Sequence, residues 1–194
     1  MKKETKPILG KLSLILGIGL LLMAVIGMGL WFWTMHTSAR QAERDVYAIR
    51  ALIPTPRNAA PESRQDNAMA VLSIDGRDFV GILEMPRYEA TFPVSADWGT
   101  VFKAPCRFSG SIYDRTIQIG GTSQKGQFDF YRELSVGDSV FFTDMEGNRF
   151  SYTVTNIRYT SHADQAALRR EEAALTLFIR NIFGFEYIIV SCNI

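Results

Sequence analysis

The sequence predicts a mainly β domain, built as a closed or nearly closed antiparallel barrel and preceded by one membrane-spanning helix. Three features indicate this: a long uncharged run near the N-terminus, a linker rich in proline, and many short β-type segments with few helical ones. Of the 194 residues, 47% are hydrophobic and 21% are charged, which excludes a disordered chain. The net charge of +1 gives no electrostatic case for a nucleic-acid partner.

Residues 12–35 contain no formally charged side chain and predict a transmembrane helix. At about 1.5 Å per residue, such a helix exceeds the hydrocarbon core of a bilayer, about 30 Å thick. The run is also longer than the apolar part of a cleaved signal peptide, about 7–15 residues. The cluster Trp31-Phe32-Trp33 is typical of the outer membrane interface. The lipid bilayer is therefore the first expected partner.

The charges that flank this run predict its orientation. Lysines precede it at positions 2, 3, 6 and 11, whereas the basic residues that follow it are mixed with acids. The positive-inside rule then predicts a cytoplasmic tail over 1–11, a single pass, and a C-terminal domain on the extracellular side of the cell membrane. Residues 36–67 are expected to be a stalk, helical to about 52, and a linker; residues 68–194 are expected to form one domain.

Segments that alternate between apolar and polar residues, or are rich in β-branched residues, predict the strands of this domain. They are 70–74, 78–85, 91–94, 116–120, 139–144, 149–157, 174–179 and 186–192. Asp75-Gly76 is expected to turn between the first two, and Gly147 to supply the positive φ of a later hairpin. Helical signals are confined to 163–173, where Ser161 is the expected N-cap, and a short turn of helix over 128–134.

Several short motifs follow one another in a recognisable order over 78–192. They are GILEMP (81–86) with FPV (92–94), APCRFSGS (104–111), TIQIGGT (116–122), F-x-x-Y-x-x-L-x-x-G-D-x-V (128–140), RFSYTV (149–154) and ALTLF (174–178). Their order and spacing resemble sortases, the membrane-anchored cysteine transpeptidases of Gram-positive bacteria, in particular the clostridial class B and D types. The resemblance implies a closed eight-stranded β-barrel with one or two short helices. It implies no cofactor and no metal.

The positions at which sortases carry their catalytic residues are all substituted. The resemblance places Thr122 at the family's histidine and Arg180 at its nucleophilic cysteine. Tyr187 falls at its arginine, or Glu186 does if the preceding loop is aligned one residue differently. A guanidinium is always protonated and cannot attack a carbonyl, threonine does not titrate near neutral pH, and tyrosine has no positive charge for an oxyanion. The sequence thus predicts a catalytically inactive sortase-like protein, acting as a binding or accessory module at the cell surface.

Two other functions stay open. An active cysteine transpeptidase or hydrolase, which joins surface proteins or pilins to the cell wall, is what the family resemblance alone implies. It would need a relocated dyad such as Cys192 with His162, because the only other thiol and imidazole are Cys106 and His36. A purely structural anchor domain is the third. The abrupt departure from the family over 178–189 suggests either a frameshift or a lasting loss of activity, and the separate change at Thr122 favours the second.

The cysteines and Arg180 each have two readings. Cys106 and Cys192 are either buried packing residues or a disulfide, which an extracellular location allows. Arg180 is either a solvated charge at a strand end or an anion-binding group. In the second case, a sorting-signal peptide or a cell-wall precursor is the expected partner in the groove.

Overall fold

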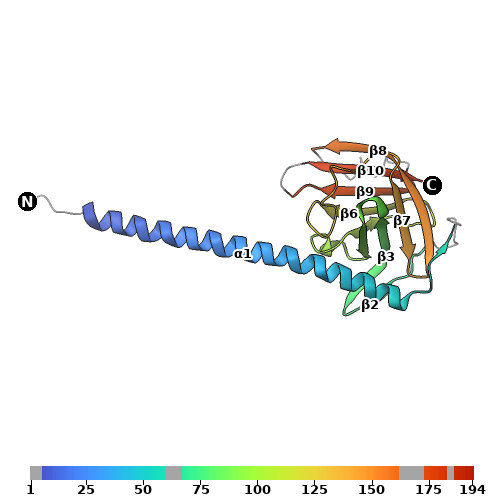
Figure 1. The fold of residues 1–194 in the computed structure, drawn as a ribbon, viewed down its shortest axis with the longest axis horizontal. Coiled ribbons are helices and arrows are strands. Elements are labelled where there is room, and N and C mark those ends of the chain that lie inside the picture. The colour runs from blue at the N-terminus through green and yellow to red at the C-terminus, as the bar shows by residue number, and fades with distance from the viewer. Residues whose placement is uncertain (1–5, 60–66, 162–172, 183–185) are drawn as a thin grey trace, which may run out of the picture. The chain divides into compact units, whose positions relative to one another are not determined.

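The computed structural model describes residues 6–59, 67–161, 173–182 and 186–194 (Figure 1). The chain divides into two compact units, Met1–Thr37 and Ser38–Ile194. One helix, α1, covers Lys6–Leu52 and joins the predicted transmembrane and stalk helices without a break. Within the first unit, Ser13–Leu30 has a mean hydropathy of 2.4, so this part of α1 is long and apolar enough to cross a membrane.

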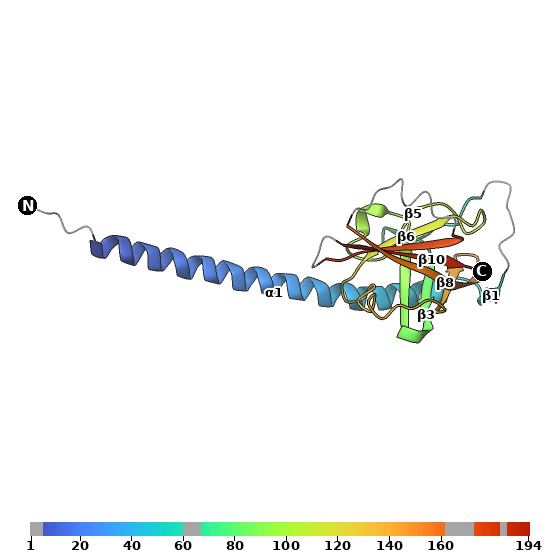
Figure 2. The same ribbon diagram turned by 90° about the horizontal axis from the view of Figure 1, so that it is seen from above.

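The second unit is a β-barrel. Its strands are β3 (Arg77–Met85), β4 (Ala90–Ser95), β5 (Cys106–Ser109), β6 (Ile117–Thr122), β7 (Ser139–Asp144), β8 (Asn148–Thr160), β9 (Leu175–Arg180) and β10 (Tyr187–Asn193). They pair in the order β8-β10-β9-β6-β5-β4-β3, and β7 closes the ring by pairing with both β3 and β8. Figure 2 shows β3 crossing the direction of β6 and β10 at a steep angle, as opposite walls of a barrel do. The predicted closed, eight-stranded barrel is confirmed.

Most neighbouring strands in the ring are antiparallel, but β6 and β9 run parallel to each other, and so do β4 and β5. Alternate side chains of each strand point inward, so that Leu83, Ile119, Phe142 and Leu177 are fully buried in one core. Each such side chain contributes about 1.5–3 kcal/mol relative to an exposed position. The alternation that predicted the strands is therefore the physical reason why the sheet curls around its own apolar face.

The expected hairpin turns are present. Asp75 (φ 49°) and Gly76 (φ 72°) form the two-residue turn between the short strand β2 (Leu72–Ile74) and β3. Gly147 has φ 79° in the β7–β8 turn, and a Cβ there would lie 2.8 Å from the carbonyl oxygen of Pro54. Positive φ and this close approach together explain the glycine.

The last turns of α1 belong to the barrel unit. Val46 and Ile49 pack against Phe79 and Ile82 on the outer face of β3, in an apolar cluster separate from the inner core. The part of the stalk after residue 37 is thus a component of the folded domain.

The segment predicted as linker, 53–67, is partly ordered instead. Residues Arg57–Asn58 form a short strand, β1, which pairs in parallel with Asn148 and Arg149 of β8. The backbone N–H of Ala59 also donates to the carbonyl of Arg149 at 2.9 Å. This pairing is made by backbone N–H and C=O groups, which every such residue carries. The side-chain pattern of the segment therefore could not predict the strand.

The helices differ from those expected. Residues 128–134 form successive turns rather than a regular helix, and Phe128, Tyr131 and Leu134 are buried in the core. Two 3₁₀ turns occur elsewhere, η1 (Pro86–Tyr88) and η2 (Trp98–Thr100). The predicted helix over 163–173 lies almost wholly outside the described residues.

Candidate functional site

The three positions that the sequence resemblance predicts at the catalytic residues of sortases form one row across three neighbouring strands. Thr122, the last residue of β6, is the register partner of Arg180, the last residue of β9. Arg180 is in turn the partner of Tyr187, the first residue of β10. Glu186 precedes β10, and its carbonyl oxygen accepts the N–H of Asn181. Tyr187 rather than Glu186 is therefore the residue opposite Arg180.

This row lies on the outer face of the barrel. Ile179 and Ile188, the neighbours of Arg180 and Tyr187 in sequence, both belong to the inner core. Since successive side chains of a strand point to opposite faces, the row must face outward. Directly opposed residues share a face, which brings the three side chains to the same end of the same surface.

An aromatic cluster covers the outer face beside the row. The rings of Trp98, Phe108 and Phe178 lie 5.0–5.4 Å apart, centroid to centroid, in mutual contact. A Cβ on Gly120 would lie 2.5 Å from the Phe178 ring and 2.6 Å from the Trp98 ring, so only glycine fits beneath them. The alternation of the predicted strand 174–179 is consistent with an outward position for Phe178, but nothing in the sequence places Phe108 or Trp98 there.

Arg180 is exposed and is the one charged member of the row. Its guanidinium carbon lies 5.8 Å from the centroid of the Phe102 ring, which is itself 54% exposed. The carbonyl of Arg180 accepts the N–H of Ser123, so the end of β9 is tied to the chain that leaves β6. The cation is thus held near an aromatic face and is open to an anionic or carbonyl ligand.

Thr122 is held by Gln127, the fifth residue after it. Its N–H donates to Oε1 of Gln127 at 2.9 Å, and Nε2 of Gln127 donates to the carbonyl of Val101 at 3.1 Å. Gln124 donates to the carbonyl of Phe102. The threonine is 1% exposed, and its Oγ1 has no hydrogen-bond partner among the described residues.

The two thiols are buried and are not joined. Cys192 lies in the inner core, fully buried, and burial raises the pKa of its thiol to about 12. Cys106 pairs with Gly120, and its Sγ contacts Oγ1 of Thr100 at 3.4 Å and the carbonyl of Ala104 at 3.2 Å. Both cysteines are free in this structure, and Cys106 lies outside the core cluster that contains Cys192.

Neither cysteine has the surroundings of a nucleophile. Burial also raises the pKa of Cys106, so both thiols stay protonated at neutral pH. His162, the other half of the dyad considered for Cys192, lies outside the described residues, and His36 belongs to the N-terminal unit.

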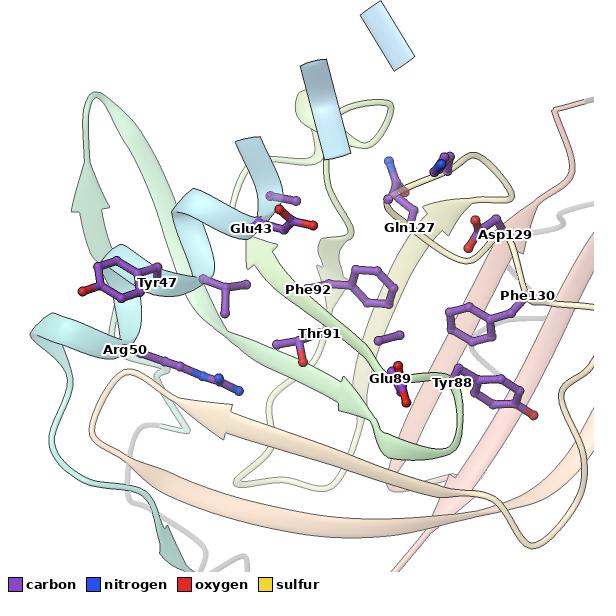
Figure 3. A pocket seen from close by; sticks show the side chains of 15 residues that line it. Glu43, Tyr47, Arg50, Tyr88, Glu89, Thr91, Phe92, Gln127, Asp129 and Phe130 are labelled. Atoms are coloured by element: carbon purple, nitrogen blue, oxygen red, sulfur yellow. The ribbon is translucent and has the colours of Figure 1, made fainter. Parts of the chain in front are cut away.

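A second concave surface, absent from the sequence analysis, lies on another part of the barrel unit (Figure 3). Its cavity volume is about 500 Å³, between the last turns of α1, the start of β4 and the segment 125–130. No member of the Thr122–Arg180–Tyr187 row lines it. Its walls come from three separate parts of the chain, which explains why no single motif signalled it.

Comparison with known proteins supports the fold alone. No family model and no curated protein matches the sequence. Among solved structures, sortase A from Corynebacterium diphtheriae matches with a TM-score of 0.51 and 15% identity, over 82% of this chain and 83% of that one. Sortase C1 from Streptococcus agalactiae matches with a TM-score of 0.50 and 17% identity, over 63% of this chain and 70% of that one. The chain therefore has a sortase-like fold.

Proposed function

We propose that this protein is a membrane-anchored, sortase-like barrel that does not catalyse acyl transfer and serves as a binding or accessory module at the cell surface. The observation that carries the proposal is the row Thr122–Arg180–Tyr187, which occupies one end of β6, β9 and β10 on one face. In sortases the equivalent positions, by sequence resemblance, hold the histidine, cysteine and arginine of the reaction.

The chemistry of the row supports binding without turnover. Acyl transfer needs a nucleophile that attacks the carbonyl and an acid–base group that moves a proton. Arg180 is permanently protonated and Thr122 does not titrate near neutral pH. Arg180 and Tyr187 can still donate hydrogen bonds, and the exposed guanidinium pairs with a carboxylate or a peptide carbonyl.

The apolar part of α1 supports the anchor. Ser13–Leu30 is long and apolar enough to span a bilayer, and lysines 2, 3, 6 and 11 precede it. By the positive-inside rule, the N-terminus is cytoplasmic and the barrel is extracellular. An extracellular barrel would meet the sorting signals of surface proteins and the precursors of the cell wall.

The test is a binding titration of the full chain in nanodiscs with a peptide that carries an LPxTG-type sorting signal. We expect saturable binding that weakens about tenfold or more in Arg180→Gln, since hydrogen bonds to a charged group contribute about 1.5–3 kcal/mol. Arg44→Gln is the matched control, because Arg44 is an exposed arginine on α1 outside the row. Release of a cleaved peptide would favour the active transpeptidase, and no binding at all would favour a purely structural anchor.

A further inference from the structure

The cavity beside α1 has an aromatic floor that is already ordered. Tyr88 and Phe130 stack with ring centroids 4.4 Å apart and planes 11° from parallel, and Phe92 follows Phe130 at 6.3 Å and 8°. The hydroxyl of Tyr88 donates to Oδ2 of Asp138 at 2.5 Å and lies 2.8 Å from the carbonyl oxygen of Glu133. These contacts fix the rings before any ligand arrives, so little side-chain entropy is lost on binding.

Three carboxylates surround this floor. Figure 3 shows Glu43 reaching in from α1, and Glu89 and Asp129 on other sides of Phe92. All three are exposed, and none of them is in an ion pair within the described part of the chain. They come from helix, turn and loop, so their gathering is a property of the folded unit rather than of a local acidic run.

The basic residues of the cavity only partly balance these carboxylates. Arg50 lines the cavity but is paired with Glu84 at 2.7 Å. Lys125 is the other lining base and lies near Asp129, where its charge opposes the effect of burial, which raises the pKa of that carboxyl. Three carboxylates therefore face one base that has no ion-pair partner among the described residues.

We propose that this cavity, the α1–β4 groove, binds a lysine- or arginine-containing peptide segment of another protein. Aromatic faces and unpaired carboxylates are the two features that attract an ammonium or guanidinium group, through cation–π and charge–charge interactions. An acidic ligand would meet repulsion from the same three side chains. A cavity of about 500 Å³ exceeds what one side chain needs and suits a short stretch of peptide. The site is distinct from the Thr122–Arg180–Tyr187 row and does not depend on its function.

Calorimetry on the full chain in phosphatidylcholine nanodiscs tests this proposal, since uncharged lipid does not itself attract the probe. The probe is the peptide acetyl-KGKGK-amide, with acetyl-EGEGE-amide as its opposite. We expect saturable binding of the lysine peptide, weaker at high salt, and none of the glutamate peptide. Neutralising Glu43→Gln, Glu89→Gln and Asp129→Asn together should weaken binding about tenfold. Asp75→Asn, which changes an exposed acid in the β2–β3 turn outside the lining, should leave binding unchanged.

Several results would overturn the proposal. Equal binding of both peptides would contradict it, and so would unchanged binding by the triple variant. So would the absence of saturable binding of the lysine peptide up to about 10 mM, a concentration above the dissociation constants of weak specific complexes. Self-association that the triple variant abolishes would show that a second copy, not a basic peptide, occupies the groove. If the triple variant does not fold, Asp129→Asn alone and the comparison of the two peptides on the unchanged chain still decide. Arg180→Gln should bind the lysine peptide normally, so failure of this proposal is distinguishable from failure of the proposed function.

Discussion

At the residue scale, the proposed function depends most on position 180, which the sequence resemblance places at the sortase nucleophile. Arg180 lies at the exposed end of β9, with register partners on both sides and the Phe102 ring nearby. A guanidinium there can hold a carboxylate or carbonyl but cannot form an acyl bond. Because Tyr187 shares its face and is partly exposed, one ligand could contact both side chains, whereas Thr122 beside them is 1% exposed.

Cys192 gives a pH-dependent prediction. Burial raises the pKa of this thiol to about 12, above the ordinary value of about 8.5. Above pH 8.5 the unfolded chain therefore loses the thiol proton while the folded chain keeps it. The contribution of this group to stability is complete below pH 8.5 and is lost as the pH rises towards 12.

The measurement is urea unfolding of the full chain and of Cys192→Ala at pH 7 and pH 10. We expect the free energy of unfolding of the unchanged chain to fall by about 2 kcal/mol more than that of Cys192→Ala over this interval. The values at pH 7 serve as the control, because the cavity left by alanine lowers the free energy of unfolding by the same amount at both pH values. Equal pH dependence in the two proteins would mean that the thiol is not buried as described.

At the scale of elements, the end of α1 is a structural part of the barrel unit. Ile49 is fully buried against β3, and Asp45 holds Arg77 of that strand by two hydrogen bonds, one of them 2.8 Å long. Arg50 and Arg149 both bind Glu84, at 2.7 and 3.1 Å. Apolar packing and the ion pairs of Asp45 and Arg50 therefore hold the same two turns of the helix against β3.

Removing the packing contribution of the helix should destabilise the barrel. We expect Ile49→Ala to lower the free energy of unfolding by about 2–5 kcal/mol, because a fully buried isoleucine leaves a cavity. Leu52→Ala, three residues further along the same helix, is the control, because Leu52 is 63% exposed. Its effect should stay within about 0.5 kcal/mol. Similar urea midpoints for both variants would indicate that the helix end is not docked on the barrel.

The sequence predicted elements well where a periodic pattern was long enough to read. The predicted segment 139–144 coincides with β7, and 186–192 differs from β10 by one residue at each end. The four-residue β5 and the two-residue β1 were missed because so short a strand shows no alternation. The segment 128–134 was predicted as a short turn of helix and forms successive turns, with Phe128, Tyr131 and Leu134 buried in the core.

The two sites differ in how far the sequence could show them. The row Thr122–Arg180–Tyr187 was located because it follows strand motifs whose order resembles a known family. The α1–β4 groove could not be located, because Glu43, Glu89 and Asp129 are far apart in sequence and come together only in the folded barrel. These three acids lie on a turn, a loop and the last turns of a helix, where no period or spacing marks them.

At the scale of the whole molecule, the sortase-like barrel is combined with an N-terminal helix suited to a membrane. Expressed in cells, the full chain should sediment with membranes and resist alkaline carbonate extraction. Replacing Leu21 and Val25 by arginine should release part of it, since each arginine near the centre of a span costs about 2.5–3.5 kcal/mol for insertion. Leu21→Ala with Val25→Ala is the control. Full carbonate extraction of the unchanged chain would contradict the anchor.

The central claim is that the barrel has kept its fold without the groups that make and break an acyl bond. The most direct measurement is the intact mass of the full chain after incubation with an LPxTG-type peptide and a nucleophilic amine, with an active sortase confirming that the peptide is competent. The account predicts an unchanged mass and no ligated product. A mass increase equal to the acyl fragment, located on Cys106 or Cys192, would contradict it.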